Sequence, residues 1–220
     1  MNILIVHAHH EPNSFNTALK NKAVEVFTQS GNQVVVSDLY AMNFKAIADK
    51  NDFKGRSENS HFKYQAEQVY AKTNNLFADD IQIEMDKLMK ADVVIFNFPL
   101  WWFSVPAILK GWVDRVFAMG FAYGGGKGVY DTGVFKGKKG MLCITTGGPD
   151  TTYLPEGKNG DIQKILFHIN HGMLYFTGMD VIPSFISYSV ARKTDEERTS
   201  ELIRYEKYLL SINDITPIQY

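Results

Sequence analysis

Hydrophobic residues recur along the chain in two alternating patterns. Short runs in which almost every residue is apolar, such as Asn2–His7 (NILIVH), are typical of strands buried on both faces of a parallel sheet. Longer segments between these runs, such as Ser14–Ser30, carry an apolar residue every three or four positions and are typical of amphipathic helices. The alternation of the two patterns predicts parallel strands joined by helical crossovers.

These patterns define the expected elements of the fold. Strands are expected at Asn2–His7, Gln33–Ser37, Val93–Phe98, Gly140–Thr146 and Met179–Phe185. Helices are expected at Ser14–Ser30, Ile81–Lys90, Pro106–Met119, Asp161–Phe176 and Asp195–Leu210. The predicted fold class is α/β, a doubly wound five-stranded parallel sheet with helices on both faces. Such sheets bind ligands beyond the carboxyl ends of their strands, at the point where the winding reverses.

The segment Ala41–Asp80 does not follow this alternation. It is polar, includes Tyr64 and Tyr70, and shows no clear hydrophobic period. Because it is too long for an ordinary loop, we interpret it as an insertion with some structure of its own or as a dimer contact. The 220 residues as a whole are long enough to bury a core and are expected to form a single domain, 1–220.

Charge and cysteine content limit the classes of partner. Lys and Arg number 23 against 24 Asp and Glu, and the net charge of -1 offers no electrostatic footprint for nucleic acid or an anionic membrane. The only cysteine, Cys143, cannot form an internal disulfide, and no basic leader precedes the first strand, so a cytoplasmic location is expected. The apolar run Val93–Leu109 is almost long enough to span a membrane, but Asn97, Ser104 and two prolines favour strand, loop and helix start. No metal site is expected.

The first strand is followed by HAHHEPNSFN, His7–Asn16. Ser14 is a good candidate for a helix N-cap, so the amides after it would point out of the helix start, where a phosphate is favoured. His9 is placed to donate a further hydrogen bond. Neither the dinucleotide-binding nor the P-loop glycine pattern is present. The alternative is a capped helix with solvated histidines.

The third predicted strand is followed by an aromatic run, Trp101–Phe103, within FPLWWFSVPAILKGWVDRVF. Aromatic side chains in a loop are costly to expose, so they either pack on a neighbour or flank a flat aromatic ligand. Core packing beneath a helix and a subunit contact are the alternatives.

The fourth predicted strand is followed by ITTGGPDTTY, Ile144–Tyr153. Its two glycines would let backbone amides approach the edge of a ligand, because glycine has no Cβ to hold the ligand away. The GGPD sequence is also compatible with an ordinary turn. Taken together, the three strand ends suit one ligand with a phosphate end and a flat aromatic end, which is the description of a flavin.

Four motifs carry a family resemblance, namely SDLYAMNF (Ser37–Phe44), FPLWWFSVPAILKGW (Phe98–Trp112), FAY (Phe121–Tyr123) and CITTGG (Cys143–Gly148). They resemble the mammalian NAD(P)H:quinone oxidoreductases and their bacterial relatives, which are flavodoxin-like flavoproteins. The resemblance runs from Ile3 to about Arg198 and includes the insertion. It implies a homodimer whose two active sites lie at the interface.

The resemblance implies roles for residues at all three strand ends. The positions that match flavin-binding residues of the family are His9, Phe15 and Asn16 at the pyrophosphate, Leu100, Trp101, Trp102 and Phe103 along the isoalloxazine, and Thr145, Thr146, Gly147, Gly148 and Tyr153 at the ring edge. Asp114 and Arg198 match an acid and an arginine that help to hold FAD. Tyr123 matches a pocket tyrosine that faces the flavin of the other subunit, and Trp102 and Phe103 are expected to contact the substrate as well.

Two positions depart from the family pattern. The family places a histidine six residues after the tyrosine that matches Tyr153, and this chain has Asn159 there. Catalysis is assigned to Tyr153, Asn159 and Gly147. An asparagine cannot become a cation, so Asn159 cannot balance the charge on a reduced flavin as the family's histidine does. The family also has a second pocket tyrosine where this chain has Gly125, inside GGGKG. The glycine run implies a roomier or more mobile pocket, so the quinone selectivity of the family is not expected to hold for this chain.

The expected activity is that of a flavin-dependent NAD(P)H:quinone oxidoreductase. NAD(P)H would pass a hydride to the flavin, and a quinone would then take two electrons in the same pocket, in a ping-pong sequence. The expected cofactor is FAD, with FMN as the alternative; the choice between NADH and NADPH and the physiological acceptor remain open. Alternatives are a nitro- or azo-reductase of the same fold, a regulatory ancillary flavoprotein of a potassium-efflux system, an electron-transfer flavodoxin, and a domain of this fold that binds no flavin.

Overall fold

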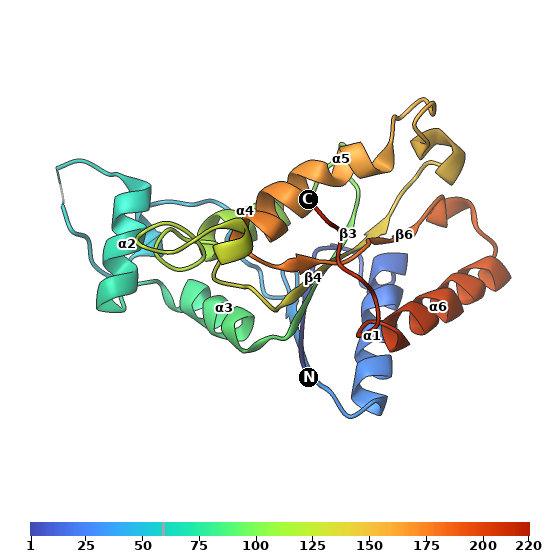
Figure 1. Ribbon diagram of the computed structural model, residues 1–220, viewed down its shortest axis with the longest axis horizontal. Helices are drawn as coiled ribbons and strands as arrows, with labels where there is room; N and C mark the ends of the chain where they lie inside the picture. Colours follow the sequence, from blue (N-terminus) through green and yellow to red (C-terminus); the bar gives the residue numbers. More distant parts are fainter. Residues whose placement is uncertain (59) are drawn as a thin grey trace.

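A parallel β-sheet forms the centre of the computed structural model, which describes residues 1–58 and 60–220 (Figure 1). Its strands are β1 (Asn2–His7), β2 (Gln33–Asp38), β3 (Val93–Pro99), β4 (Lys139–Thr145), β5 (Asp180–Val181) and β6 (Phe185–Ser187). They lie in the order β2-β1-β3-β4-β5, with β6 also paired to β4, and every pairing is parallel. The winding therefore reverses between β1 and β3, which confirms the predicted doubly wound α/β fold.

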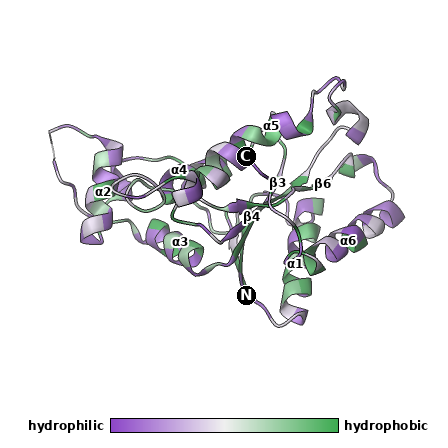
Figure 2. Ribbon diagram, viewed as in Figure 1, coloured by the Kyte–Doolittle hydropathy of each residue, from purple (hydrophilic) through white to green (hydrophobic). Residues whose placement is uncertain are grey.

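Helices cover both faces of this sheet. On one face lie α1 (Phe15–Gln29) and α6 (Asp195–Leu210), and on the other α3 (Asp79–Lys90), α4 (Ala107–Val116) and α5 (Ile162–Ile169). Successive strand side chains point to opposite faces, so Ile3 and Ile5 join the core under α1 and α6, whereas Leu4 and Val6 join the other core. Figure 2 shows the strands as the most hydrophobic segments, as expected for a sheet buried on both sides.

The predicted fifth strand is interrupted. Met179–Phe185 was expected to be continuous, but β5 ends at Val181 and β6 begins at Phe185. Pro183 lies between them and has no backbone N–H to donate to β4, which accounts for the break in the ladder. Both pieces still pair with β4, so they occupy the position predicted for one strand.

The segment between β2 and α3 contains structure that the hydrophobic pattern did not reveal. Helix α2 spans Tyr64–Asn74, and a short 3-10 turn spans Lys50–Asp52. The buried side of α2 is formed largely by polar residues, Glu67 and Gln68, which explains why no hydrophobic period was visible. The segment thus has structure of its own, while its status as an insertion and its use as a dimer contact stay predictions.

One buried arginine ties this insertion to the rest of the fold. Arg115 of α4 is 1% exposed and contacts Asp52, which is also buried, at 3.0 Å. The same guanidinium lies 2.7 Å from a carboxylate oxygen of Asp80 and donates to the backbone carbonyl of Lys45 at 2.8 Å. Two carboxylates and a carbonyl thus satisfy a charge that would be costly to bury alone.

Helix α6 has its predicted bounds and α3 starts two residues earlier than predicted, whereas α5 is much shorter than the predicted Asp161–Phe176. Helix α5 ends at Ile169 and continues as a wider π-helical turn, Asn170–Leu174, and a 3-10 turn, Tyr175–Thr177. The run Val93–Leu109 forms the buried strand β3, a loop and the start of α4. Across residues 1–58 and 60–220, no helix has the length and apolar character that crossing a membrane requires.

Candidate active site

A cleft of about 1020 Å³ opens beyond the carboxyl ends of β1, β3 and β4. This is the position at which the winding reverses, where doubly wound sheets bind their ligands. Four segments line the cleft: the first turn of α1 with the loop before it, the loop after β3, the loop after β4, and the start of α6 with the loop before it. Three of these segments are the strand ends that the sequence singled out.

The start of α1 presents donors to the cleft. Ser14 caps the helix, because its hydroxyl oxygen accepts from the backbone N–H of Thr17 at 3.2 Å. Asn16 is 2% exposed, and its side-chain carbonyl oxygen accepts from the hydroxyl of Thr145 at 2.6 Å. Its amide nitrogen has no hydrogen-bond partner among the described residues. A buried donor without a partner is costly, so this nitrogen is available for an acceptor bound in the cleft.

His9 supplies a second donor. Its Nδ1 accepts from the backbone N–H of Glu11 at 3.0 Å, so in the neutral ring Nε2 carries the proton. Burial and the neighbouring imidazole of His10 lower the pKa of His9, which favours this neutral form. The two imidazoles stack at 4.9 Å, and both lie close to the ring of Trp101.

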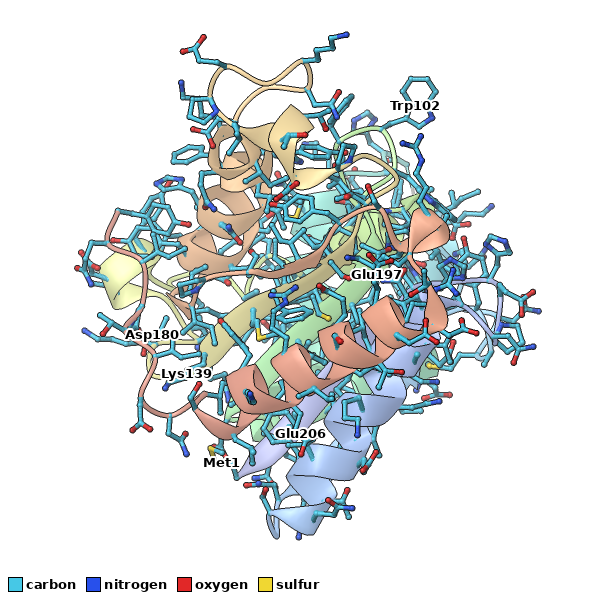
Figure 3. The ribbon with its side chains drawn as sticks, turned by 90° about the vertical axis from the view of Figure 1, so that its right-hand side faces the viewer. Met1, Trp102, Lys139, Asp180, Glu197 and Glu206 are labelled. Atoms are coloured by element: carbon cyan, nitrogen blue, oxygen red, sulfur yellow. The ribbon has the colours of Figure 1, made fainter. Side chains whose placement is uncertain are left out.

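The loop after β3 holds its aromatic residues in an uncommon backbone conformation. Trp102 and Phe103 have φ values of +51° and +59°, in the left-handed region that bulky residues rarely adopt. The backbone N–H of Ser104 donates to the carbonyl of Trp101 at 3.0 Å and closes the turn. As a result the side chain of Trp102 is 94% exposed and projects outward at the upper right of Figure 3.

The loop after β4 leaves room for a ligand. Thr145, Thr146 and Gly147 line the cleft, and a Cβ built on Gly147 would meet no atom within 4 Å. The hydroxyl of Thr146 donates to the carbonyl of Gly148 at 2.8 Å, which fixes the turn. The backbone of Gly147 can therefore be approached closely, whereas Gly148 does not line the cleft.

The start of α6 forms the fourth wall and contributes a cation. Thr194 and Glu197 form a reciprocal capping box, in which each side chain accepts from the other residue's backbone N–H. One turn further, Arg198 lines the cleft, donates to Asp195 at 2.8 Å and to the carbonyl of Val190 at 3.3 Å. The resemblance placed only Arg198 of this wall.

Six predicted site residues do not line the cleft of the single chain. Gly148, Tyr153 and Asn159 gather behind its rim, where a Cβ on Gly148 would lie 3.3 Å from the ring of Tyr153 and 3.4 Å from the amide nitrogen of Asn159. The amide of Asn159 donates to the hydroxyl of Thr152 at 3.0 Å. Phe103 is half-exposed beside Trp102 without lining the cleft.

The other two, Asp114 and Tyr123, share a separate cavity of about 340 Å³. Asp114 pairs with Lys110 at 2.6 Å, and the hydroxyl of Tyr123 accepts from the amide of Gln65 at 3.1 Å. The single chain therefore does not bring either residue to the cleft, and their predicted roles there remain predictions.

The cleft also has walls that the sequence did not indicate. These lining residues are Asn13, Ala18, Pro99, Val190, Ala191, Asp195, Thr199 and Leu202. Most belong to α6 and the loop before it. The capping pattern T-x-x-E at Thr194–Glu197 signals where that helix starts, but only the three-dimensional arrangement shows that this start faces the first turn of α1.

Comparison with known proteins places the chain in a family. A family model described as flavodoxin-like fold matches residues 1–209. Ribosyldihydronicotinamide dehydrogenase (quinone) of Pongo abelii is 45% identical over 217 residues, which are 98% of this chain and 94% of that protein. NAD(P)H dehydrogenase (quinone) 1 of Cavia porcellus is 43% identical over 218 residues, 99% of this chain and 79% of that protein.

The solved structures agree. A Klebsiella pneumoniae protein described as a candidate quinone reductase matches with a TM-score of 0.96 and 41% identity, covering 99% of this chain and 87% of that one. The chain therefore belongs to the quinone dehydrogenase family of flavodoxin-like proteins, as its motifs predicted.

Proposed function

We propose that this protein is a flavin-dependent oxidoreductase that transfers electrons from NAD(P)H to quinones. The observation that carries the proposal is the cleft at the reversal point of the sheet, with a buried, unpartnered amide donor on Asn16 at one side and an aromatic loop at the other. These features suit the phosphate and the flat ring system of one flavin.

Within this proposal, the residues at the start of α1 bind the phosphate end. The helix N-terminus, the amide of Asn16, Nε2 of His9 and the guanidinium of Arg198 would donate to phosphate oxygens. The bound flavin would supply the hydride-accepting and electron-donating chemistry. Leu100, Trp101 and Trp102 would hold its ring in place, and the backbone of Thr146 and Gly147 would lie along the ring edge.

The proposed cofactor is FAD rather than FMN. Beyond the phosphate site, the cleft extends between α1 and α6, where Ala18 and Leu202 line it. FMN ends at its phosphate and would leave this apolar region uncovered, whereas the adenosine of FAD would fill it.

A cytoplasmic location belongs to the same proposal, since the only cysteine, Cys143, is a free and buried thiol.

A homodimer would complete the site. Trp102 is almost fully exposed in the single chain, and Tyr123 and Asp114 line a cavity apart from the cleft. An exposed aromatic side chain of this size favours a partner surface. We propose that the second subunit covers Trp102 and brings its own Tyr123 to the cleft, as the family resemblance implies, together with its Asp114, which lines the same cavity as Tyr123.

Ribosyldihydronicotinamide is a second candidate electron donor. The chain spans 94% of the Pongo abelii relative whose name specifies this donor, against 79% of the Cavia porcellus relative whose name specifies NAD(P)H. This difference in length favours testing the smaller donor beside NADH and NADPH.

The visible spectrum of the purified protein under anaerobic conditions tests the proposal. Yellow flavin bands should bleach with one of the three donors and return when a quinone is added. Bands that resist all three donors would reject the reductase activity and leave a regulatory or carrier flavoprotein. A protein that stays colourless with added FAD or FMN would reject the flavin assignment. Nitro and azo acceptors, compared with quinones at a saturating donor concentration, separate the related reductases.

A further inference from the structure

A buried histidine lies directly behind the proposed phosphate site, and none of the steps above uses it. His7, the last residue of β1, is 1% exposed. Its Nδ1 lies 2.6 Å from the side-chain carbonyl oxygen of Asn97, the residue opposite it on β3. Its Nε2 lies 3.4 Å from the hydroxyl of Thr17 in α1. The imidazole thus connects the centre of the sheet to the helix that starts at the cleft.

The contacts of His7 define where its protons lie. The Asn97 oxygen can only accept, so Nδ1 carries a proton and the neutral ring has its lone pair on Nε2. In this form the single hydroxyl proton of Thr17 is shared between Nε2 and the carbonyl of Glu11, to which Thr17 donates at 3.2 Å. A second proton, taken up at Nε2, would reverse the hydrogen bond between Nε2 and Thr17 and make Thr17 the acceptor.

The hydroxyl of Thr17 connects this change to the cleft. It lies 3.0 Å from the hydroxyl of Ser14 and 3.2 Å from the carbonyl of Glu11. When Thr17 accepts from an imidazolium, its own proton goes to the Glu11 carbonyl. Ser14, which lines the cleft, no longer needs to donate to Thr17 and can turn its proton toward an anion.

The charges around His7 leave this protonation sensitive to a bound anion. Burial lowers the pKa of His7, while Asp38 on β2 opposes that effect and Lys20 on α1 and the nearby His9 add to it. On the β4 side, burial raises the pKa of the Cys143 thiol to about 11, so it stays neutral. A phosphate at the start of α1 would add negative charge close to the imidazole and favour its protonated form.

We propose that His7 is a positioning residue of the phosphate site, which takes up a proton from solvent at Nε2 when a phosphorylated flavin binds, and thereby holds the Thr17 hydroxyl on the Glu11 carbonyl and leaves the Ser14 hydroxyl to donate to the phosphate. This inference rests on the proposed flavin-binding function. By linkage, the flavin should bind more tightly when His7 is protonated, and binding should raise the pKa of His7 in turn.

The direct test is an NMR titration of the His7 ring signals in the full-length protein without flavin, with FAD and with riboflavin. FAD should raise the apparent pKa of His7 by about one unit, which corresponds to about a tenfold difference in affinity between the two protonation states. Riboflavin has no phosphate and should leave it unchanged. FAD is preferred to FMN because the phosphomonoester of FMN titrates itself, with a second pKa of about 6.

The pH dependence of flavin affinity, followed by fluorescence, is a second and independent test of the coupling between His7 protonation and flavin binding. His9 also titrates in the cleft, so the comparison is made in a His9→Gln background. There FAD should bind about tenfold more tightly as the pH falls from about 8.5 to 5.5, and adding His7→Gln should remove this dependence. Thr17→Val keeps the imidazole but removes the hydroxyl that it orients, and should weaken the dependence.

The outcomes separate this inference from the proposed function. If FAD binds but the His7 titration is the same with and without it, the inference is rejected and flavin binding stands. If the FAD affinity still depends on pH after His7→Gln is added, the inference is also rejected. If neither FAD nor FMN binds at any pH, the inference and the proposed function both fail. If the His7→Gln variant does not fold, the NMR titration of His7 in the wild-type protein still tests the inference.

Discussion

The hydroxyl of Thr145 donates a 2.6 Å hydrogen bond to the side-chain carbonyl of Asn16, joining the end of β4 to the first turn of α1 across the cleft. Because the carbonyl oxygen is engaged, the amide nitrogen of Asn16 is left as the free donor of this side chain, without a partner among the described residues. The bond between two buried residues far apart in sequence thus orients one functional group of the site.

Replacing Asn16 with aspartate tests that orientation. Asn16→Asp keeps the size of the side chain but replaces the amide donor with a carboxylate oxygen that repels a phosphate. We expect the flavin affinity to fall by about tenfold or more, because hydrogen bonds to charged groups contribute about 1.5–3 kcal/mol. Equilibrium dialysis with FAD gives the measurement.

Thr145→Val is the matched control for this change. It removes the hydroxyl that orients Asn16 but keeps the amide donor itself, and should cost about 1 kcal/mol of stability with a smaller loss of affinity. Equal losses of affinity in the two variants would show that the amide does not bind the phosphate.

Two tryptophans of the same motif should respond in opposite ways. Trp112 is fully buried and donates to Glu84 at 2.8 Å, whereas Trp102 is 94% exposed. Trp112→Ala should lower the free energy of unfolding by about 3–5 kcal/mol, while Trp102→Ala in the dissociated chain should change it by less than about 0.5 kcal/mol. Urea denaturation measures both.

The Trp102→Ala variant also addresses the proposed dimer. If a second subunit covers this side chain, sedimentation equilibrium should show a larger dissociation constant for the variant than for the wild type. An unchanged constant would argue against Trp102 as part of an interface.

Installing the family's histidine tests the departure at Asn159. In Asn159→His the new imidazole can accept a proton and become a cation near Tyr153, which asparagine cannot do. We expect faster bleaching of the flavin by the nicotinamide donor and a steeper dependence of that rate on pH, measured by stopped flow. A rate and pH profile identical to those of the wild type would show that this position does not take part.

The stability of the flavin-free protein should fall at acid pH because of His7. Burial holds its pKa below the ordinary value of 6.5, so between these two pKa values the unfolded chain binds more protons than the folded one. Stability is therefore lost as the pH falls through 6.5 toward the folded pKa of His7. Denaturation at a series of pH values should give a shallower acid slope for His7→Gln. A His→Gln substitution at the exposed position 61, His61→Gln, is the matched control for the change of residue type.

Much of the fold could be predicted from the sequence because its strands are almost entirely apolar. Asn2–His7 and Val93–Phe98 matched β1 and β3 to within one residue, since a strand buried on both faces leaves an uninterrupted hydrophobic run. Helix α2 escaped prediction because its buried side is polar: Gln68 accepts from the backbone N–H of Met119, so hydrogen bonding replaces the usual apolar packing.

The candidate site was predictable where it is built from consecutive residues. His9, Asn16, Trp101 and Gly147 follow buried strands, and parallel strands end at the same edge of the sheet, so their meeting at one cleft follows from topology. Of the residues that α6 contributes, only Arg198 was foreseen, from the resemblance; Leu202 was not, since it reaches the cleft only through the packing of that helix beside α1. Tyr123 and Asp114 matched family positions, but a single sequence does not specify how two chains assemble.

Arg115 links the evolutionary histories of α4 and the segment before α3. Its guanidinium is enclosed by Asp52, Asp80 and the backbone of Lys45, so any descendant that deleted the segment containing Lys45 and Asp52 would retain a buried cation with only Asp80 of these three partners. Shortening the segment therefore requires a second change at position 115, and the two changes would have to occur together or with the arginine lost first. Among homologues, the presence of this segment and of an arginine at this position should be inherited as one character.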